Sequence, residues 1–332
     1  MSEPILQIRN LTTTFPSAGK RVPVVDGINL SINAGEILSL VGESGSGKSM
    51  TALSAMRLVP KPGRIEPHSS IILEGRDILK ISVGEMRSVR GAGMAMIFQE
   101  PMTSLNPVQT VGRQIVEAIR LHEKVSRKAA RARTVELFEQ VGIPDPAQRF
   151  DTFPHQLSGG LKQRVMIAMA LSMHSKFLIA DEPTTALDVT VQAQILDLLR
   201  KLRDEMNTAI LLITHDLGVV NEVSDRVAVM YAGKIVERGS RLDILHHPRH
   251  PYLFGLLASM PGRAAPGERL AEIPGVVPPP AQWPQGCRFS TRCSKKFAPC
   301  AETPPLEIDL GGGHTTSCHY VASQLENKEV PA

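Results

Sequence analysis

The first 286 residues of this 332-residue chain contain no cysteine. No apolar run approaches the length of about 18 residues that a membrane-spanning helix requires, so we expect no such helix. The N-terminus carries Glu3 and lacks a positively charged stretch before an apolar core, which is not the pattern of a secretory signal. These absences predict a cytoplasmic chain, in which disulfides would have little use.

A strong charge imbalance is also lacking. The formal net charge is +4, and this gives no reason to expect nucleic acid as a partner, because that function calls for a concentrated basic face. Hydrophobic residues make up 42% of the chain and charged residues 21%, which is ordinary for a folded globular protein. The length suggests about two domains, and no internal repeat is visible.

The most informative stretch is Gly42–Ser49, which fits the pattern G-x-x-x-x-G-K-[ST] of a phosphate-binding loop. It follows the apolar run Ile37–Val41, a strand candidate, and precedes the helix candidate Thr51–Val59. Glycines let the backbone approach a polyphosphate, and the helix N-terminus offers N–H groups to its charge. We therefore expect this loop to bind a nucleotide polyphosphate with Mg²⁺ through Gly42, Ser44, Gly45, Gly47, Lys48 and Ser49, and the resemblance described below implies that this nucleotide is ATP. Lys48 would reach the β- and γ-phosphates, and Ser49 would ligate the Mg²⁺.

Polar side chains at the ends of apolar runs supply the other candidate groups. Asp181 and Glu182 follow the buried run Phe177–Ala180, where a phosphate-loop protein places an acid that holds Mg²⁺. Glu182 can then act as the general base that polarises the attacking water. His215 can bond the γ-phosphate, and Gln99 can touch both metal and water. Neither His215 nor Gln99 is diagnostic by itself.

The chain changes character along its length. Strands alternate with helices up to about residue 245, which predicts an α/β fold with a mainly parallel sheet. Residues of about 100–173 read as a helical insert, whose basic run from Lys124 to Arg133 is expected to be a solvated helix face. Residues 246–332 are rich in proline and read as a small, loop-rich C-terminal extension. We therefore predict a domain of residues 1–245 and an extension of residues 246–332.

The segment Leu157-Ser158-Gly159-Gly160 discriminates among phosphate-loop proteins. Together with the loop, its order and spacing resemble the ATP-binding subunits of ABC transporters, a resemblance that covers residues 5–240. It implies an ABC-type nucleotide-binding domain of the P-loop NTPase class with a helical subdomain. Two ATPase domains then pack head to tail, and Ser158, Gly159 and Gly160 of one bind the γ-phosphate held by the other.

The same resemblance gives roles to further residues. Gln99 matches the Q-loop, Asp181-Glu182 the Walker B acids, Ala186-Leu187-Asp188 the D-loop and His215 the switch histidine. Phe15 lies where the family stacks an aromatic side chain on adenine. This chain departs from the family in having Leu161 where Gln is usual and Phe15 where Tyr is usual, and neither change removes a group that does chemistry.

A narrower resemblance, to dipeptide and oligopeptide importers, is carried by Phe98–Pro107, by His250-Pro251-Tyr252 and by the cysteine-containing segment from Gly286. It implies an ATPase that drives peptide uptake from the cytoplasmic face of the cell membrane. Its partners would be a second, related ATPase subunit, two permeases and an external solute-binding protein. Nickel or glutathione importers of the same branch, an exporter ATPase, and a soluble ABC ATPase acting on nucleic acid or the ribosome are the alternatives.

All the cysteines lie at the C-terminal end, in the pattern C-x5-C-x6-C-x17-C formed by Cys287, Cys293, Cys300 and Cys318. Four thiolates can hold Zn²⁺ or an iron–sulfur cluster, but the spacing fits neither the common zinc pattern nor a ferredoxin. The resemblance to peptide importers favours a [4Fe-4S] cluster with a structural role. Zinc, and thiols or disulfides without a metal, remain open.

Overall fold

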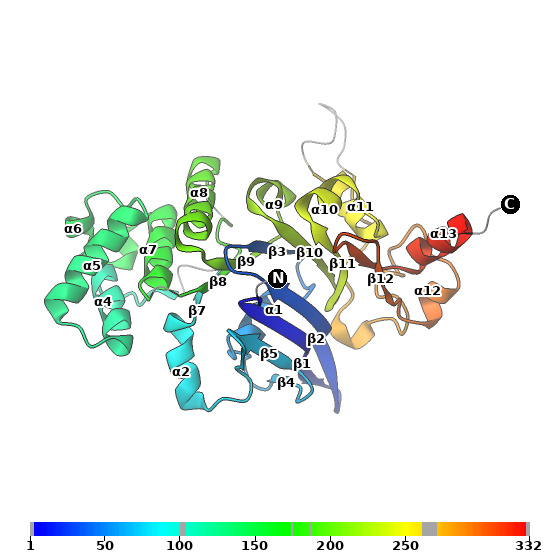
Figure 1. Ribbon diagram of the computed structural model, residues 1–332, viewed down its shortest axis with the longest axis horizontal. Coiled ribbons are helices and arrows are strands. Elements are labelled where there is room, and N and C mark those ends of the chain that lie inside the picture. The colour runs from blue at the N-terminus through cyan, green and yellow to red at the C-terminus, as the bar shows by residue number, and fades with distance from the viewer. Residues whose placement is uncertain (1–2, 100–103, 174, 186, 261–270, 330–332) are drawn as a thin grey trace. The chain divides into compact units, whose positions relative to one another are not determined.

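The computed structural model describes residues 3–99, 104–173, 175–185, 187–260 and 271–329 (Figure 1). Two positions named above therefore lie outside the described residues, namely residues 100–103 of the importer-like stretch and Ala186. The chain forms two compact units. The first consists of Met1–Gln7, Ser31–Glu36 and Ile72–Ile213, and the second of Ile8–Leu30, Ile37–Ile71 and Thr214–Ala332.

The first unit contains short strands and most of the long helices. Its elements are β6 (Arg76–Asp77), α2 (Val83–Ala92), β7 (Met94–Ile97), α4 (Val111–His122), α5 (Arg127–Gln140), α6 (Pro146–Arg149), the 3-10 turn Pro154–Gln156, α7 (Gly159–Leu171), β8 (Phe177–Asp181), α8 (Val189–Met206) and β9 (Ala209–Thr214). Strand β5 (Ser70–Leu73), which lies at the border of the two units, pairs antiparallel with β6.

Strands β7, β8 and β9 run parallel, with Met94 opposite Phe177 and Asp181 opposite Ile213. Every residue of β8 and β9 is buried, as expected for parallel strands covered on both faces. The continuous apolar runs in the sequence reflect this double burial. The carboxyl end of β8 delivers Asp181 and Glu182 to the end of the parallel sheet, where ligands bind in such folds.

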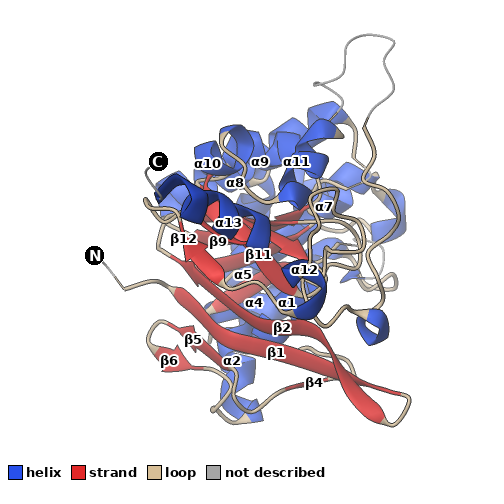
Figure 2. Ribbon diagram, turned by 90° about the vertical axis from the view of Figure 1, so that its right-hand side faces the viewer, coloured by secondary structure: helices blue, strands red, loops and turns tan. Residues whose placement is uncertain are grey.

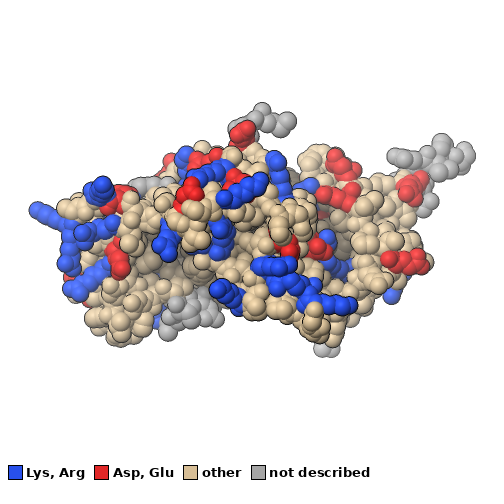
Figure 3. Space-filling model, turned by 90° about the horizontal axis from the view of Figure 1, so that it is seen from below, with Lys and Arg blue, Asp and Glu red and all other residues tan. Residues whose placement is uncertain are grey.

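The predicted helical insert is present as α4 to α7, which Figure 1 shows as a separate group of helices in green and cyan. Phe138 is fully buried in it, and Gly112 lies so close to Phe150 that a Cβ there would be 2.3 Å from the ring. Figure 3 shows Lys and Arg side chains over this group of helices. Lys124, Arg127, Lys128 and Arg131 are exposed, as expected of a solvated helix face, whereas Arg133 is half-buried and pairs with Glu123.

The second unit contains the remaining elements. These are β1 (Leu6–Ser17), β2 (Lys20–Ile32), β3 (Ile37–Val41), α1 (Lys48–Ala55), β4 (Arg64–Ile65), α9 (Leu217–Val223), β10 (Arg226–Tyr231), β11 (Lys234–Ser240), α10 (Arg241–His246), α11 (Pro251–Ala258), the 3-10 turn Pro280–Gln282, α12 (Pro299–Glu302), β12 (Glu307–Asp309), β13 (Thr315–Ser317) and α13 (His319–Glu329). Strand β1 lies beside β2 and pairs antiparallel with β4.

Strand β3 pairs parallel with β10, and β10 turns back into β11 as an antiparallel hairpin. The extension then adds β13 and β12 to the edge of β11, both antiparallel (Figure 2). The core is continuous across residue 245, because Val41 and Val229 belong to the same buried cluster as Tyr252, Leu257 and Phe289. The predicted domain boundary at residue 245 stays a prediction.

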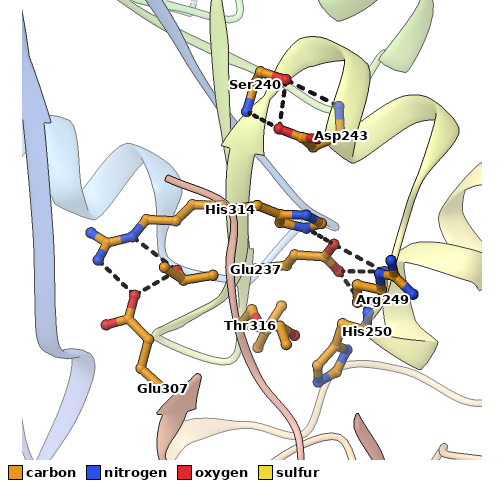
Figure 4. Close-up of polar contacts among 11 residues, drawn as sticks. Glu237, Ser240, Asp243, Arg249, His250, Glu307, His314 and Thr316 are labelled. Carbon is orange, nitrogen blue, oxygen red and sulfur yellow. Dashed lines mark hydrogen bonds and ion pairs between the residues drawn. The ribbon is translucent and has the colours of Figure 1, made fainter. Parts of the chain in front are cut away.

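A buried carboxylate fastens the extension to β11 (Figure 4). The side chain of Glu237 is 0% exposed and accepts hydrogen bonds from the backbone N–H groups of Arg249 at 2.9 Å and His250 at 2.6 Å. It also pairs with Nε2 of His314 at 2.8 Å, and Oγ1 of Thr316 donates to the carbonyl of Val236. A buried carboxylate is stable only with such partners, so Glu237 links α11 and β13 to the sheet.

Among the helices that the structure describes, none combines the length and the apolar character needed to cross a membrane. The strands expected at Ile37–Val41 and Phe177–Ala180 are observed as β3 and as the first four residues of β8. The helix expected over 51–59 instead begins at Lys48, inside the phosphate loop, and ends at Ala55.

Buried His250 makes stability acid-sensitive. Its Nδ1 caps α11 by accepting the N–H of Tyr252 at 3.1 Å, and burial lowers its pKa from 6.5 to about 3. Below pH 6.5 the imidazole of His250 is protonated in the unfolded chain but stays neutral in the folded chain. The stabilisation is therefore complete above that pH and is lost as the pH falls toward 3. His250→Asn keeps a neutral cap.

We expect the unfolding free energy of wild type, relative to His250→Asn, to fall by about 2 kcal/mol between pH 7 and pH 5. Urea unfolding of both proteins at the two pH values measures this difference. A difference that does not change with pH would show that His250 is not held neutral in the folded chain.

Candidate functional site

The glycines of the phosphate loop are required by close backbone contacts in the second unit. A Cβ at Gly42 would lie 2.2 Å from the carbonyl oxygen of Met230, and one at Gly47 would lie 2.8 Å from that of Val24. Gly47 also has φ +110° and is the N-cap of α1. Gly45, with φ +78°, has no atom within 4 Å of a Cβ position, so its outer side is open. Gly42 and Gly47 thus allow the loop to lie close to the neighbouring backbone, and Gly45 leaves room for a ligand.

Lys48 folds back over the loop. Its Nζ donates to the carbonyl oxygens of Gly42 at 2.7 Å and Glu43 at 3.1 Å, and the residue is 5% exposed. The buried Oγ of Ser46 has no hydrogen-bond partner among the described residues. Ser44 is exposed and Ser49 is half-buried at the start of α1. An ammonium group, an unused hydroxyl and a helix N-terminus converge here, which is the donor set that a polyphosphate with Mg²⁺ requires.

Phe15 belongs to the same unit and is half-buried near the end of β1. Its ring packs on Gly63, where a Cβ would lie 2.5 Å from Cζ. His215 follows β9 and is exposed at the start of the turn into α9. The neighbouring Asp216 caps that helix by accepting the N–H of Gly218 at 2.7 Å. The turn that carries His215 is thereby ordered by its own residues.

In the first unit, Asp181 is 4% exposed at the end of β8, and Glu182 follows it. Oε2 of Glu182 accepts Nε2 of Gln99 at 3.2 Å and Oγ1 of Thr185 at 2.9 Å. Glu182 has φ +48°, a left-handed conformation that is uncommon for a residue with a side chain. Its N–H is bonded to the carbonyl of Ile213 at 2.9 Å, so the surroundings hold this conformation. The structure brings together three of the predicted residues here: Gln99, Asp181 and Glu182.

Ser158 is the N-cap of α7 and accepts the N–H of Leu161 at 3.4 Å. The two glycines that follow have different surroundings. A Cβ at Gly160 would lie 2.8 Å from Cγ1 of Val191, whereas one at Gly159 would meet nothing within 4 Å. Gly160 is thus required by packing against α8, and Gly159 presents an open helix N-terminus on the surface.

The four cysteines are free thiols, two buried and two half-buried. Burial raises the pKa of Cys287 to about 11, and the charges of Cys318, Cys300 and Cys293 add to this effect. Burial likewise raises the pKa of Cys293 and of Cys318. The thiols therefore lie in one region. Among the described residues, however, no three His, Cys, Asp or Glu side chains are arranged to hold a metal ion.

Sequence reasoning missed the residues that hold the site in shape. Thr185 was not singled out, although it lies three residues after Glu182, a spacing that could have suggested the bond. The partners of Glu43, which are Tyr252 and Arg292, come from the extension. No local sequence pattern predicts contacts between residues that lie this far apart in the chain.

Two segments of the chain match models of known protein families. The family model described as "ABC transporter" matches residues 25–185, and the model "Oligopeptide/dipeptide transporter, C-terminal region" matches residues 236–300. The chain is 48% identical to the oligopeptide transport ATP-binding protein OppD of Bacillus subtilis, over 98% of this chain and 90% of that one. It is 49% identical to the dipeptide transport ATP-binding protein DppD of Escherichia coli, over 95% of this chain and 96% of that one.

Solved structures show the same fold. The ATP-binding cassette MJ0796, described as a dimer bound to ADP and phosphate in a post-hydrolysis state, has a TM-score of 0.64 at 26% identity. The similarity covers 71% of this chain and 98% of that cassette. CbiO1 of Clostridium perfringens, part of the ABC transporter complex cbiONQ, has a TM-score of 0.63 at 27% identity, over 74% of this chain and 93% of that one.

The two glycines at the start of α7 give a matched pair of variants. Gly160→Ala places a methyl group against the β-branched Val191 and should lower the unfolding free energy by about 1 kcal/mol or more. Gly159→Ala enters open space and should leave it unchanged or slightly higher, because Ala favours the helix. Urea unfolding followed by circular dichroism measures both. Equal destabilisation by the two variants would contradict the assignment of Gly159 to an open surface.

Proposed function

The chain belongs to the ATP-binding subunits of oligopeptide and dipeptide ABC transporters, and we propose that it hydrolyses ATP at composite sites to drive peptide uptake into the cell. It is an ATPase whose activity is coupled to transport. The observation that carries the assignment is the match of both the ATPase part and the C-terminal part of the chain to peptide transport ATP-binding proteins. Peptides are thus the proposed cargo.

In the proposed site, the phosphate loop binds the nucleotide. Backbone N–H groups of the loop and Nζ of Lys48 bind the β- and γ-phosphates, and Lys48 exchanges its two carbonyl partners for phosphate oxygens. Ser49, Gln99 and Asp181 are the proposed Mg²⁺ ligands, and the ion would neutralise charge that develops on the phosphates. Phe15 is the proposed stacking partner of adenine.

Glu182 is the proposed general base. Its carboxylate is oriented by hydrogen bonds from Gln99 and Thr185, and its backbone is held in a left-handed conformation. In this position it would accept a proton from the water that attacks the γ-phosphate. His215 is proposed to bond the γ-phosphate and so to distinguish ATP from ADP.

Ser158, Gly159 and Gly160 are proposed to act on the nucleotide of a second ATPase subunit. The open N-terminus of α7 offers N–H groups and a hydroxyl, which suit the γ-phosphate. The site is then complete only when two ATPase domains close on each other. Closure would be coupled to two membrane permeases through the segment from Gln99 to Leu121, with an external solute-binding protein delivering the peptide. The subunit would lie on the cytoplasmic face of the membrane.

Replacing the base tests this mechanism. Glu182→Gln keeps the hydrogen bonds of the side chain but cannot take a proton, so the ATPase rate should fall by about 100-fold or more while ATP binding is retained. The variant should also accumulate the closed ATPase pair with ATP. Phosphate release by the assembled transporter and sedimentation of the ATPase pair measure the two effects. Glu205→Gln, at an exposed position near the end of α8, is the matched control. Wild-type turnover by Glu182→Gln would refute the assignment.

For the cysteines, a [4Fe-4S] cluster with a structural role is proposed. To ligate a cluster, the thiols would have to lose their protons, which burial makes less favourable by raising their pKa. The positive charge of the cluster's iron would compensate for the negative charge of the thiolates. Anaerobically purified protein should contain about four iron and four sulfide per chain and absorb in the visible blue. Cys300→Ser should lose the iron. Stoichiometric zinc without iron would rule the cluster out.

A further inference from the structure

The second residue of the phosphate loop is held by the C-terminal extension. The N–H of Glu43 donates to Oη of Tyr252 at 2.9 Å. Nη1 of Arg292 lies 3.1 Å from Oε1 and 3.0 Å from Oε2 of the Glu43 carboxylate. The side chain of Arg292 is 4% exposed and that of Glu43 is 28% exposed, so this ion pair is partly shielded from water. Both the backbone and the side chain of Glu43 therefore have their partners in the extension.

Arg292 is itself rigidly placed. Its Nε donates to the carbonyl of Pro274 at 2.8 Å and its Nη2 to that of Ile273 at 3.2 Å. Tyr252 is equally constrained, because it is fully buried and packs edge-on against Tyr231 at 4.7 Å between ring centroids. Burial, together with the nearby Glu43 carboxylate, raises the pKa of Tyr252 well above its ordinary value. The hydroxyl thus remains neutral and continues to accept the N–H of Glu43.

Glu43 connects this support to the residues that bind phosphate. Its carbonyl oxygen accepts Nζ of Lys48 at 3.1 Å and the N–H of Ser46 at 3.2 Å. A shift of Glu43 would therefore move both the lysine and the backbone that surround the bound phosphates. The carbonyl of Ser46 is held in turn by the N–H of Gly233 at 2.7 Å.

A second contact from the extension reaches the same loop. Arg288 donates to the carbonyl of Ala232 and pairs with Asp26, while its guanidinium lies 3.8 Å from the ring centroid of Trp283. Ala232 directly precedes Gly233 in the β10–β11 turn. Two arginines of one short segment thus hold the phosphate loop, one at Glu43 and one through the β10–β11 turn.

We propose that Arg292 and Tyr252 are positioning residues of the phosphate loop, through which the C-terminal extension sets the affinity of this ATPase for nucleotide. The proposal rests on the proposed function only in taking Gly42–Ser49 as the nucleotide site. Neither residue is assigned a contact with the nucleotide. Both act through Glu43, by keeping the loop in the conformation that accepts phosphate and so reducing the conformational cost of binding.

The test is a double-mutant cycle between Glu43 and Arg292, read as the dissociation constant of Mg-ADP for the purified full-length chain. Arg292→Met should raise this constant by about threefold to tenfold, the worth of one to two shielded polar contacts. Tyr252→Phe keeps the ring and should give an effect of similar size. In a Glu43→Gln background, the further effect of Arg292→Met should be smaller than in wild type, because its charged partner is already gone.

Arg238→Met is the matched control. Arg238 also joins the extension to the sheet, by pairing with Glu307 at 2.6 Å and with Thr315, but it touches no residue of the phosphate loop. Arg238→Met should leave the affinity for ADP unchanged. A loss of stability alone should also leave this affinity unchanged, and unfolding of each variant in the absence of nucleotide measures its stability separately. Wild type that fails to bind ADP would refute the proposed function. Wild type that binds ADP, with an effect of Arg292→Met that is the same in both backgrounds, would refute the positioning role alone.

Discussion

The close approach of the phosphate loop to the backbone of β10 is the constraint on which the second unit depends. Only 2.2 Å would separate a Cβ at Gly42 from the carbonyl oxygen of Met230, so the loop lies directly on the strand. At this point Met230 is fully buried and lies opposite Ile235 of β11, directly after an irregularity in register between Val229 and Met230, and the pairing with β3 reaches Val229. Tyr252 and Phe289 of the extension then pack on Tyr231, at the end of β10. The phosphate loop is thus supported by the backbone of β10, and the end of β10 is in turn covered by the extension.

In the first unit, Glu182 has a strained backbone conformation. A left-handed conformation at a residue with a side chain costs of the order of 1 kcal/mol, and the chain bears it at the end of a fully buried strand. The hydrogen bond to Ile213 and the contacts with Gln99 and Thr185 offset part of this cost. The left-handed conformation and these contacts orient the carboxylate before any substrate is present.

Much of this could be predicted from sequence, for identifiable reasons. The strands β3, β8 and β9 are continuous apolar runs because both of their faces are buried, and the loops that follow them carry local motifs. The role of Gly159 as distinct from Gly160 could not be predicted, because it depends on where Val191 of α8 lies. Nor could the pairs Glu237–His314 and Glu43–Arg292, which are set by tertiary packing over long separations in the chain. The start of α1 at Lys48 could not be predicted either, because the glycines directly before it have a low helix propensity.

The order of residues in the extension has a consequence for how the subunit responds to its surroundings. Arg288 directly follows Cys287, and Arg292 directly precedes Cys293, so each arginine that holds the loop is the covalent neighbour of a thiol. Any chemistry that displaces these thiols also displaces the arginines. Because linkage is reciprocal, an extension that favours the nucleotide-bound loop is itself stabilised when nucleotide binds. The segment that carries Cys287 and Cys293 would then become more ordered each time the loop binds nucleotide.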